Sequence, residues 1–377
     1  MKGLLKIISC FLLIFINFPT YVLCLSTHNS RALVFVPPML SSKLQDTKNN
    51  NEIVWLDFSF RSLIKIRKNL SYLQFDENGK PLRESIKAFP TKNLNMNVLS
   101  DYGVGDCDKK TIQNLEKKFG PKSEYKCDII RYAYDWRKSC SETSDGLVDL
   151  AKKYNELYIV SCSEGGLLVC DSLVKILKDN DLSSRIKCSV FIAVPFCGTL
   201  EPLYVFYNGI RLGGWLGMLA NFFGIDDITK ELSRNLPAMY ELLPQEDCYV
   251  TKKIKSSVWY KRKTGNLKEF LKEANRFHKN LYIGDKHIAS CYNSYFVCGS
   301  GIDTMACLRG KDKLKIYKTA DGDGTVLFTS SYPIGIDKDK VIKVKNTKHE
   351  KMTVSDSVLN TINKILDNNI TRCLCYV

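Results

Sequence analysis

The sequence lacks long polar tracts, internal repeats and low-complexity linkers. Their absence excludes an intrinsically disordered chain, a repeat array and a string of domains joined by flexible segments. What remains is an ordinary globular composition of 377 residues, 45% of them hydrophobic. A chain of this length can bury one large core, or a core with a cap.

Long apolar runs are also scarce. Residues 203–223 are apolar overall, but Asn208, Arg211 and Asn221 interrupt them, and five glycines lie within or just beyond the run. These residues argue against a stable membrane-spanning helix. We therefore expect a mobile or interfacial cap element in this region.

The other apolar run, residues 4–18, follows a lysine near the start of the chain and has the layout of a signal peptide. We expect residues 1–24 to be that signal peptide, with an uncleaved anchor as the alternative. The remaining chain, residues 25–377, is then expected to enter the secretory pathway. Its predicted destination is secretion or a lysosomal or vacuolar lumen.

The charge balance is strongly basic, with a formal net charge of +15. Loss of Lys2 and Lys6 with the signal peptide lowers this charge by two, to +13. The basic residues are spread along the chain without a nucleic-acid-binding motif, so we expect no nucleic-acid partner. A phospholipid membrane or lipoprotein surface carrying anionic lipids fits the charge better. The sequence leaves the oligomeric state open.

Thirteen of the 15 cysteines follow the signal segment, and an odd number requires at least one free thiol. In an oxidising compartment some bridges are expected, although the sequence does not assign the pairing. The candidate participants are Cys107, Cys127, Cys373 and Cys375. Two N-glycosylation sequons begin at Asn69 and Asn369 and agree with secretion.

Short β-branched or aromatic runs alternate with helical patterns along the chain. The helical patterns lie near residues 147–154, 167–177 and 354–365. Strand followed by helix, repeated, predicts an α/β fold with a mainly parallel central sheet. The predicted strands cover residues 33–36, 129–132, 157–160, 189–194, 295–298 and 341–344.

Two insertions, at about residues 45–105 and 199–290, break this alternation. Each carries an aromatic cluster outside the predicted core, which together with the basic charge predicts a membrane-contacting cap. The alternative is that both clusters pack against the core. The predicted contact residues are Trp55, Leu56 and Phe58 in the first insertion, and Trp215, Leu216, Leu219, Phe222 and Phe223 in the second.

Residues 158–166 have the pattern of a nucleophile elbow, a tight turn from a strand into a helix. The positions two before and two after the nucleophile must be small, and Ser161 and Gly165 flank Ser163 in this way. An ordinary helix N-cap serine is the alternative. Cys162 is disfavoured as the nucleophile, because Glu164 would then occupy a position that must be small.

Histidine is scarce, and this narrows the search for a base to His28, His278, His287 and His349. A serine nucleophile needs a base, and the base needs a carboxylate, in the chain order serine, acid, histidine. Only His349 follows the last predicted strand and precedes the last helix. Upstream of it, Asp323 sits in a glycine-flanked turn. A calcium-binding or simple turn is the alternative there, but the full EF-hand ligand set is missing.

Six segments in one order resemble the lecithin:cholesterol acyltransferase and lysosomal phospholipase A2 family. Residues 36–44, Val-Pro-Pro-Met-Leu-Ser-Ser-Lys-Leu, resemble its oxyanion loop, and that name is kept for them below. The other five are residues 54–56 (its Trp-Leu element), 134–137 (its Tyr-Asp-Trp-Arg signature), 193–199 (its post-elbow strand end), 321–326 (its acid-bearing turn) and His349.

The resemblance implies an α/β-hydrolase fold and a role for each matched residue. Ser163 forms the acyl-enzyme, His349 acts as base and then acid, and Asp323 orients His349. The backbone N–H groups of Met39 and Glu164 form the oxyanion hole, and neither metal nor organic cofactor is needed. The implied activity is that of a serine phospholipase A or lipid acyltransferase. The alternative is a catalytically inactive lipid-binding protein on a hydrolase scaffold.

The chain departs from the family at three positions near the nucleophile. Cys162 replaces a histidine, Glu164 replaces a methionine or leucine, and Met39 replaces an acid of the lysosomal branch. We expect Glu164 to point at solvent, because it lies in a helix's first turn. With no acid at position 39, the rate should follow His349 and rise to a neutral plateau.

Overall fold

The computed structural model describes residues 30–55, 65–89, 106–209, 225–244, 267–310 and 313–371. Its centre is a sheet whose six strands all pair in parallel. The strands are β1 (Arg31–Val36), β5 (Asp128–Arg131), β6 (Glu156–Cys162), β7 (Ile186–Ile192), β10 (Ser294–Ser300) and β13 (Val341–Lys345). Their order is β13-β10-β7-β6-β1-β5. Each coincides with one predicted run, and the prediction of a parallel α/β fold is confirmed.

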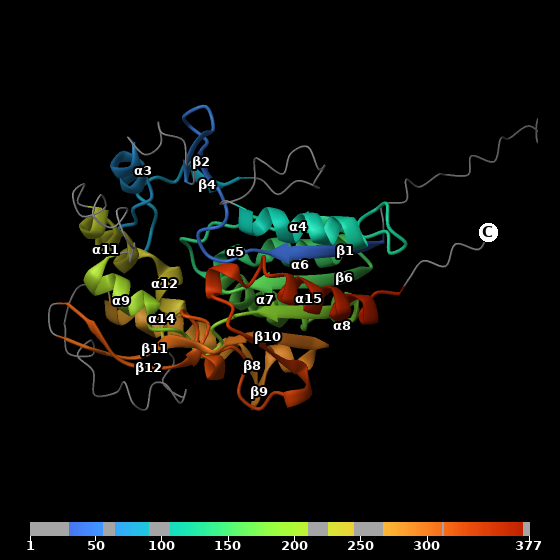
Figure 1. The fold of residues 1–377 in the computed structure, drawn as a ribbon. Coiled ribbons are helices and arrows are strands. Elements are labelled where there is room, and N and C mark those ends of the chain that lie inside the picture. Colours follow the sequence, from blue (N-terminus) through green and yellow to red (C-terminus); the bar gives the residue numbers. More distant parts are fainter. Residues whose placement is uncertain are drawn as a thin grey trace, which may run out of the picture.

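Helices cover both faces of this sheet (Figure 1). Leu33 and Phe35 of β1 pack into one cluster with α4 (Asp106–Phe119) and α15 (Asp356–Asn369). The alternate β1 residues, Ala32, Val34 and Val36, belong to a second cluster on the other face. That cluster includes residues of α6 (Asp145–Lys153) and α7 (Glu164–Ile176). The three predicted helical patterns fall on α6, α7 and α15.

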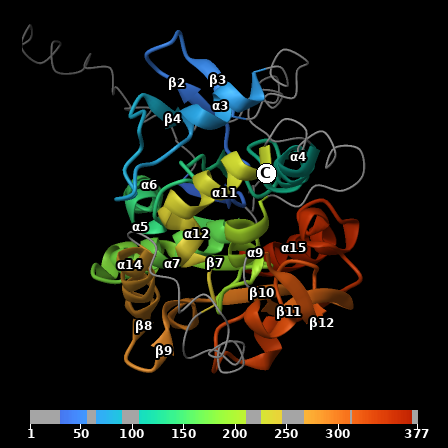
Figure 2. The same cartoon turned by 90° about the vertical axis from the view of Figure 1, so that its left-hand side faces the viewer.

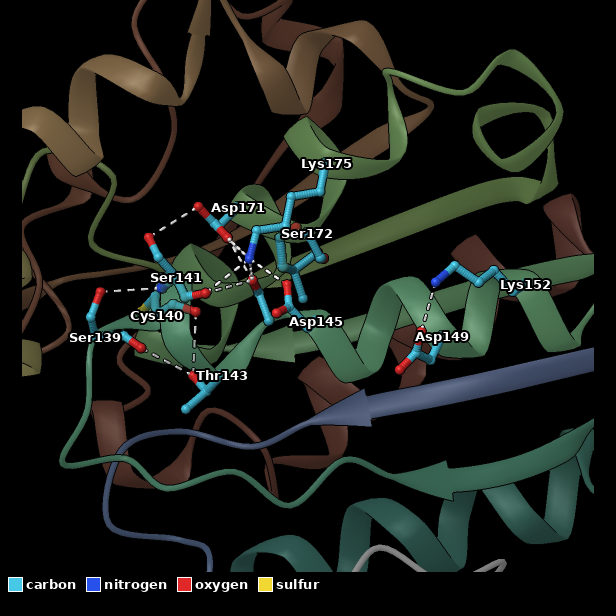
Figure 3. Close-up of polar contacts among 12 residues, drawn as sticks. Ser139, Cys140, Ser141, Thr143, Asp145, Asp149, Lys152, Asp171, Ser172 and Lys175 are labelled. Carbon is cyan, nitrogen blue, oxygen red and sulfur yellow. Dashed lines mark hydrogen bonds and ion pairs between the residues drawn. The ribbon is translucent and has the colours of Figure 1, made fainter.

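A polar network ties α7, the helix after the elbow, to α6 and to the short helix α5 (Cys140–Thr143) (Figure 3). The Lys175 ammonium donates to Ser144 Oγ at 2.7 Å and to Asp145 Oδ1 at 2.6 Å. It also lies 3.0 Å from Asp171 Oδ2, which comes from its own helix. The Asp171 side chain is 10% exposed and that of Asp145 is 75% exposed, so water weakens the contact with Asp145 more than the contact with Asp171.

The two insertions supply separate elements outside the central sheet. In the first, an antiparallel sheet of order β3-β2-β4 lies beside α3. In the second, α11 packs against both α3 and α9 (Figure 2). Their bounds are β2 (Leu44–Asp46), β3 (Glu52–Trp55), α3 (Ile66–Tyr72) and β4 (Ile86–Ala88), then α9 (Glu201–Asn208), α11 (Ile225–Asn235), α12 (Pro237–Glu241), α14 (Leu267–Asn280), β8 (Tyr282–Ile283), β9 (Lys286–His287) and the 3-10 turn η3 (Ile288–Cys291).

An antiparallel hairpin that the sequence analysis did not predict joins β10 to the acid-bearing turn. It consists of β11 (Ile302–Arg309) and β12 (Lys315–Gly322), and it extends from the body on the same side as the cap helices (Figure 1). Three 3-10 turns follow: η4 (Phe328–Ser330), η5 (Lys338–Lys340) and η6 (His349–Lys351). Among the described residues, none of the helices has the length and apolar character needed to span a bilayer.

Candidate active site

Ser163 occupies a strained turn between β6 and α7. Its backbone φ is 53° and its ψ is −130°, a conformation that non-glycine residues adopt at a cost of order 1–3 kcal/mol. The turn is held because the Ser163 N–H donates to Ile192 O at 2.9 Å. The helix also comes very close to the oxyanion loop: a Cβ added to Gly165 would lie 2.4 Å from Pro37 O. The small residue at position 165 is therefore a geometric requirement of the elbow.

The structure brings Ser163, His349 and Asp323 together in one hydrogen-bonded chain. His349 Nε2 lies 3.1 Å from Ser163 Oγ, and His349 Nδ1 lies 2.8 Å from Asp323 Oδ2. Both distances are those expected of a nucleophile, its base and an orienting acid. A hydrogen bond of 2.8 Å from the His349 backbone N–H to Asp323 O holds the two segments in register.

Asp323 is fully buried, and its second oxygen is occupied by the backbone. Asp323 Oδ1 accepts from the N–H groups of Thr325 at 3.0 Å and Val326 at 2.7 Å. The neighbouring acid of the turn, Asp321, is exposed and pairs with Lys343 at 3.1 Å. Of the two acids in this turn, Asp323 is therefore the one in contact with the histidine.

The carboxylates around His349 control its protonation. Burial alone would lower the pKa of His349, but the Asp323 carboxylate outweighs it, and Glu350 and Glu201 add to the effect. The net result raises the pKa of His349 above its ordinary value. A base must be neutral to accept a proton, so the raised pKa moves the lower limit of activity toward neutral pH.

Side chains far away in the sequence hold the carbonyls of the oxyanion loop. Trp55 Nε1 donates to Leu40 O at 2.8 Å, and Trp136 Nε1 donates to Ser42 O at 3.2 Å. Arg131 donates to Ser41 O at 2.9 Å. Leu40 itself has a φ of 68°, a left-handed conformation that such anchoring keeps in place.

The anchoring arginine is itself fixed by a buried ion pair. Arg131 Nη2 lies 2.6 Å from Asp108 Oδ2, and both side chains are 2% exposed. The same Asp108 oxygen accepts from Ser41 Oγ at 2.6 Å. Sequence reasoning missed Asp108 and Arg131, and no motif in the sequence marks them. Arg137 pairs with Asp135 at 2.7 Å and donates to Ile86 O, so this pair also joins the end of β5 to the first insertion.

A cavity of about 450 Å³ opens onto Ser163 and His349. Its volume lies within the usual range for sites that bind small molecules. The walls are mainly apolar and come from the oxyanion loop, the first insertion and the cap helices. They include Met39, Trp55, Val205, Leu232, Leu236 and Met239. The arrangement offers an apolar ligand direct access to the nucleophile.

Trp55 is half-buried, packs against Trp136 with ring centroids 5.1 Å apart and contributes to the cavity wall, and its membrane contact stays a prediction. The expectation for Glu164 was wrong. Glu164 does not point at solvent: it is 1% exposed, because α7 is buried on all sides at its first turn. The other predicted membrane contacts lie outside the described residues: Leu56, Phe58, Trp215, Leu216, Leu219, Phe222 and Phe223.

Neither of the predicted modification sites lines the cavity. Asn69 is half-buried on α3. Asn369 ends α15, and its side-chain amide donates to Ile365 O and accepts from Asn293, both at 2.7 Å. Buried free thiols include Cys140, Cys170, Cys188 and Cys298. Glycosylation and disulfide pairing stay predictions.

Comparison with known proteins supports the fold. No protein-family model matches the chain, and a search of curated proteins gave no match. The crystal structure of the Tle4–Tli4 complex is similar over 90% of this chain and 99% of that chain, with a TM-score of 0.58 and 10% identity. The mature lipase BlEst2 of Bacillus licheniformis covers 90% of this chain and 92% of its own, with a TM-score of 0.40 and 12% identity.

EstA from Clostridium botulinum is similar over 92% of this chain and 89% of its own, with a TM-score of 0.39 and 13% identity. At 10% identity, the likeness to the Tle4–Tli4 complex concerns the fold alone. The parallel sheet, the elbow at Ser163 and the helices on both faces define an α/β-hydrolase fold. The comparisons give no support to the narrower resemblance to the lecithin:cholesterol acyltransferase and lysosomal phospholipase A2 family, which stays a hypothesis.

Proposed function

We propose that this chain is a serine-dependent ester hydrolase that acts on esters with a hydrophobic acyl chain. The observation that carries the proposal is the apolar cavity of about 450 Å³ that ends at Ser163 and His349. Burial of methylene groups contributes roughly 0.8 kcal/mol each, so such a cavity favours long acyl chains over acetyl groups.

The reaction begins when Ser163 Oγ attacks the acyl carbonyl carbon and His349 Nε2 takes the hydroxyl proton. The tetrahedral oxyanion is stabilised by the backbone N–H groups of Met39 and Glu164, each contributing about 3 kcal/mol. Collapse of the intermediate breaks the ester bond, and His349 returns the proton to the leaving alcohol. Asp323 stabilises the imidazolium throughout, without itself taking the proton.

An acyl-Ser163 ester remains, and a second nucleophile removes it. Water, or the hydroxyl of a lipid alcohol, attacks the acyl carbon while His349 accepts its proton. The oxyanion forms again in the same hole, and Ser163 leaves with the proton returned by His349. The products are a free fatty acid when water attacks and a new ester when a lipid alcohol does.

The narrower proposal is that the substrate is a glycerophospholipid presented by an anionic membrane. The hairpin beside the cap supports a lipid surface as partner. Ile316 and Tyr317 of β12 are 42% and 49% exposed, and Lys315 and Lys318 flank them. Arg309 of β11 stacks on the Tyr317 ring at 3.4 Å. Exposed apolar residues surrounded by basic ones match the chemistry of an anionic bilayer surface.

An inactive lipid-binding protein on the same scaffold is the competing proposal. The distances of 3.1 and 2.8 Å along the chain from Ser163 through His349 to Asp323 disfavour it. So does the strained φ at Ser163, which a protein without a nucleophile has no reason to maintain.

The test is incubation of the purified chain with liposomes of mixed phospholipid and sterol, followed by mass spectrometry of the products. Free fatty acid with lysophospholipid supports a phospholipase, and steryl ester supports an acyltransferase. Ser163→Ala is the matched control, since it removes one oxygen from a turn held by the backbone. Hydrolysis of soluble long-chain esters without attack on liposomes would support the proposal of an ester hydrolase and reject the narrower proposal of a phospholipid substrate. Absence of turnover on every ester would reject the proposal.

A further inference from the structure

The carboxyl group of Glu164 is buried directly behind the oxyanion loop, next to the nucleophile. Its Oε2 atom lies 2.9 Å from the Tyr134 hydroxyl oxygen. The same hydroxyl lies 3.0 Å from Pro37 O, a carbonyl of the oxyanion loop. Glu164, Tyr134 and Pro37 thus form a continuous polar chain from the first turn of α7 to the oxyanion loop.

The charge of Glu164 decides how many hydrogens are available to the hydrogen bonds of this polar chain. The Pro37 carbonyl only accepts, and the Tyr134 hydroxyl has a single hydrogen. If Glu164 is ionised, two buried acceptors compete for that hydrogen, and the charged one attracts it more strongly. If Glu164 is protonated, it donates to the Tyr134 oxygen, and the Tyr134 hydrogen is free to bind Pro37 O. Only the protonated form satisfies both contacts.

The surroundings of Glu164 favour the neutral form. Burial raises the pKa of the Glu164 carboxyl well above its ordinary value, the Tyr134 hydrogen bond acts against this, and Glu241 and Asp135 add to it. The titratable groups that face this site are Tyr134 and Asp135 after β5, Cys140 of α5, Cys162 at the end of β6 and Glu241 of α12. Glu164 Oε1 has no hydrogen-bond partner within the described part of the chain.

We propose that neutral Glu164 is a positioning residue: it leaves the Tyr134 hydrogen on Pro37 O and so holds the oxyanion loop in its active position. The inference rests on the proposed ester hydrolysis. Ionisation of Glu164 draws the Tyr134 hydrogen away and leaves the loop without its anchor at Pro37, while the anchors at residues 40–42 remain. It also places a negative charge beside the N–H group that stabilises the oxyanion. Activity therefore has an upper pH limit set by Glu164, above the lower limit set by His349.

The experiment measures kcat and KM for a soluble long-chain ester from mildly acidic to alkaline pH. The wild type should lose kcat by at least about tenfold at alkaline pH, the loss expected from one charged-group hydrogen bond, with little change in KM. Glu164→Gln keeps an N–H that donates to Tyr134 and cannot ionise, so its kcat should stay level over the same range. Tyr134→Phe should lower kcat about tenfold at every pH.

Glu241→Gln is the matched control, because it removes another buried carboxyl, one that belongs to α12 and accepts from Ser139 and Cys140. It should retain the alkaline fall in kcat, moved to lower pH because Glu241 helps to raise the pKa of Glu164. A fall that persists in Glu164→Gln, or one that vanishes only in Glu241→Gln, would overturn the inference.

Infrared difference spectra between wild type and Glu164→Gln give a readout that needs no turnover. A protonated-carboxyl band at neutral pH that disappears at alkaline pH supports the inference, and an ionised Glu164 at neutral pH overturns it. If no ester is hydrolysed at any pH, the proposed function fails, and the inference that rests on it fails as well. If esters are hydrolysed but the alkaline fall persists in Glu164→Gln, the inference fails and the proposed function stands.

Discussion

Replacing Gly165 with alanine would place a methyl group against the backbone of the oxyanion loop. The added Cβ would lie 2.4 Å from Pro37 O and 2.9 Å from Val36 O. An ordinary carbon–oxygen contact is about 3.3 Å, so the loop must retreat by roughly 0.9 Å. Because both neighbours are backbone atoms, no side chain can rotate away to relieve the contact.

A shift of this size should affect catalysis more than folding. Loss of one oxyanion donor lowers kcat by roughly 10² to 10³, whereas overpacking costs about 1–3 kcal/mol of stability. We expect Gly165→Ala to fold, to keep its KM within a fewfold and to lose at least about a hundredfold in kcat. The assay is hydrolysis of a soluble ester, with urea unfolding measured on the same preparation.

Gly166→Ala is the matched control on the same helix. Its Cβ would meet the Val194 side chain at 2.2 Å, so it should cost stability without moving the oxyanion loop. If Gly165→Ala kept kcat within about threefold of the wild type, the close packing of α7 against the oxyanion loop would have no catalytic role. Equal losses of kcat in both variants would also refute the reasoning.

Three further changes test other parts of the site. Asp323→Asn should lower kcat by roughly 10⁴, as measured with the same ester, since it leaves His349 without its orienting charge; a loss under tenfold would contradict the assigned role. Trp55→Phe removes one hydrogen bond to the oxyanion loop, worth about 1 kcal/mol, and should lower kcat about fivefold with unchanged liposome binding, while weaker binding would support the predicted membrane contact of Trp55. The pKa of Glu241 is raised to about 7, mainly by burial, so the folded state holds its proton more tightly than the unfolded state; Glu241 should contribute up to about 3 kcal/mol to the fall in the free energy of unfolding between pH 4.5 and pH 7, and urea unfolding of Glu241→Gln should show a fall smaller by that amount, whereas an unchanged fall would contradict the raised pKa.

The central sheet was predictable because its strands, apart from the edge strand β13, are mostly buried on both faces. Parallel strands of this kind appear in a sequence as short continuous runs of β-branched and aromatic residues, and all six were found. The proximity of Ser163, Asp323 and His349 followed from chain order, since the carboxyl ends of parallel strands meet at one edge of the sheet. Four histidines left little choice for the base.

The position of Glu164 was not predicted, because a general rule about helix first turns was applied to a helix that is buried on every side. A signal was available: residues 165–170 of α7 contain no charged residue, which is typical of a helix without a solvent face. The burial of Trp55 depends on Trp136 and Leu40, which are distant in the sequence, so no local pattern could indicate it.

The hairpin of β11 and β12 escaped prediction for a local reason. Its register shifts near Cys307, which breaks the regular alternation of buried and exposed residues in β11. The residues of β12 are almost all exposed, so the strand carries no apolar face that a periodicity argument could detect.

The most direct test of the account is labelling with a long-chain fluorophosphonate, which reacts with activated serines, followed by mass spectrometry of the peptides. The account predicts a stoichiometric adduct on Ser163 that is lost in Ser163→Ala and strongly slowed in His349→Ala. Cys162→Ala should label as the wild type does. An unlabelled wild type, or an adduct that persists in Ser163→Ala, would contradict the claim that Ser163 is the nucleophile of an ester hydrolase.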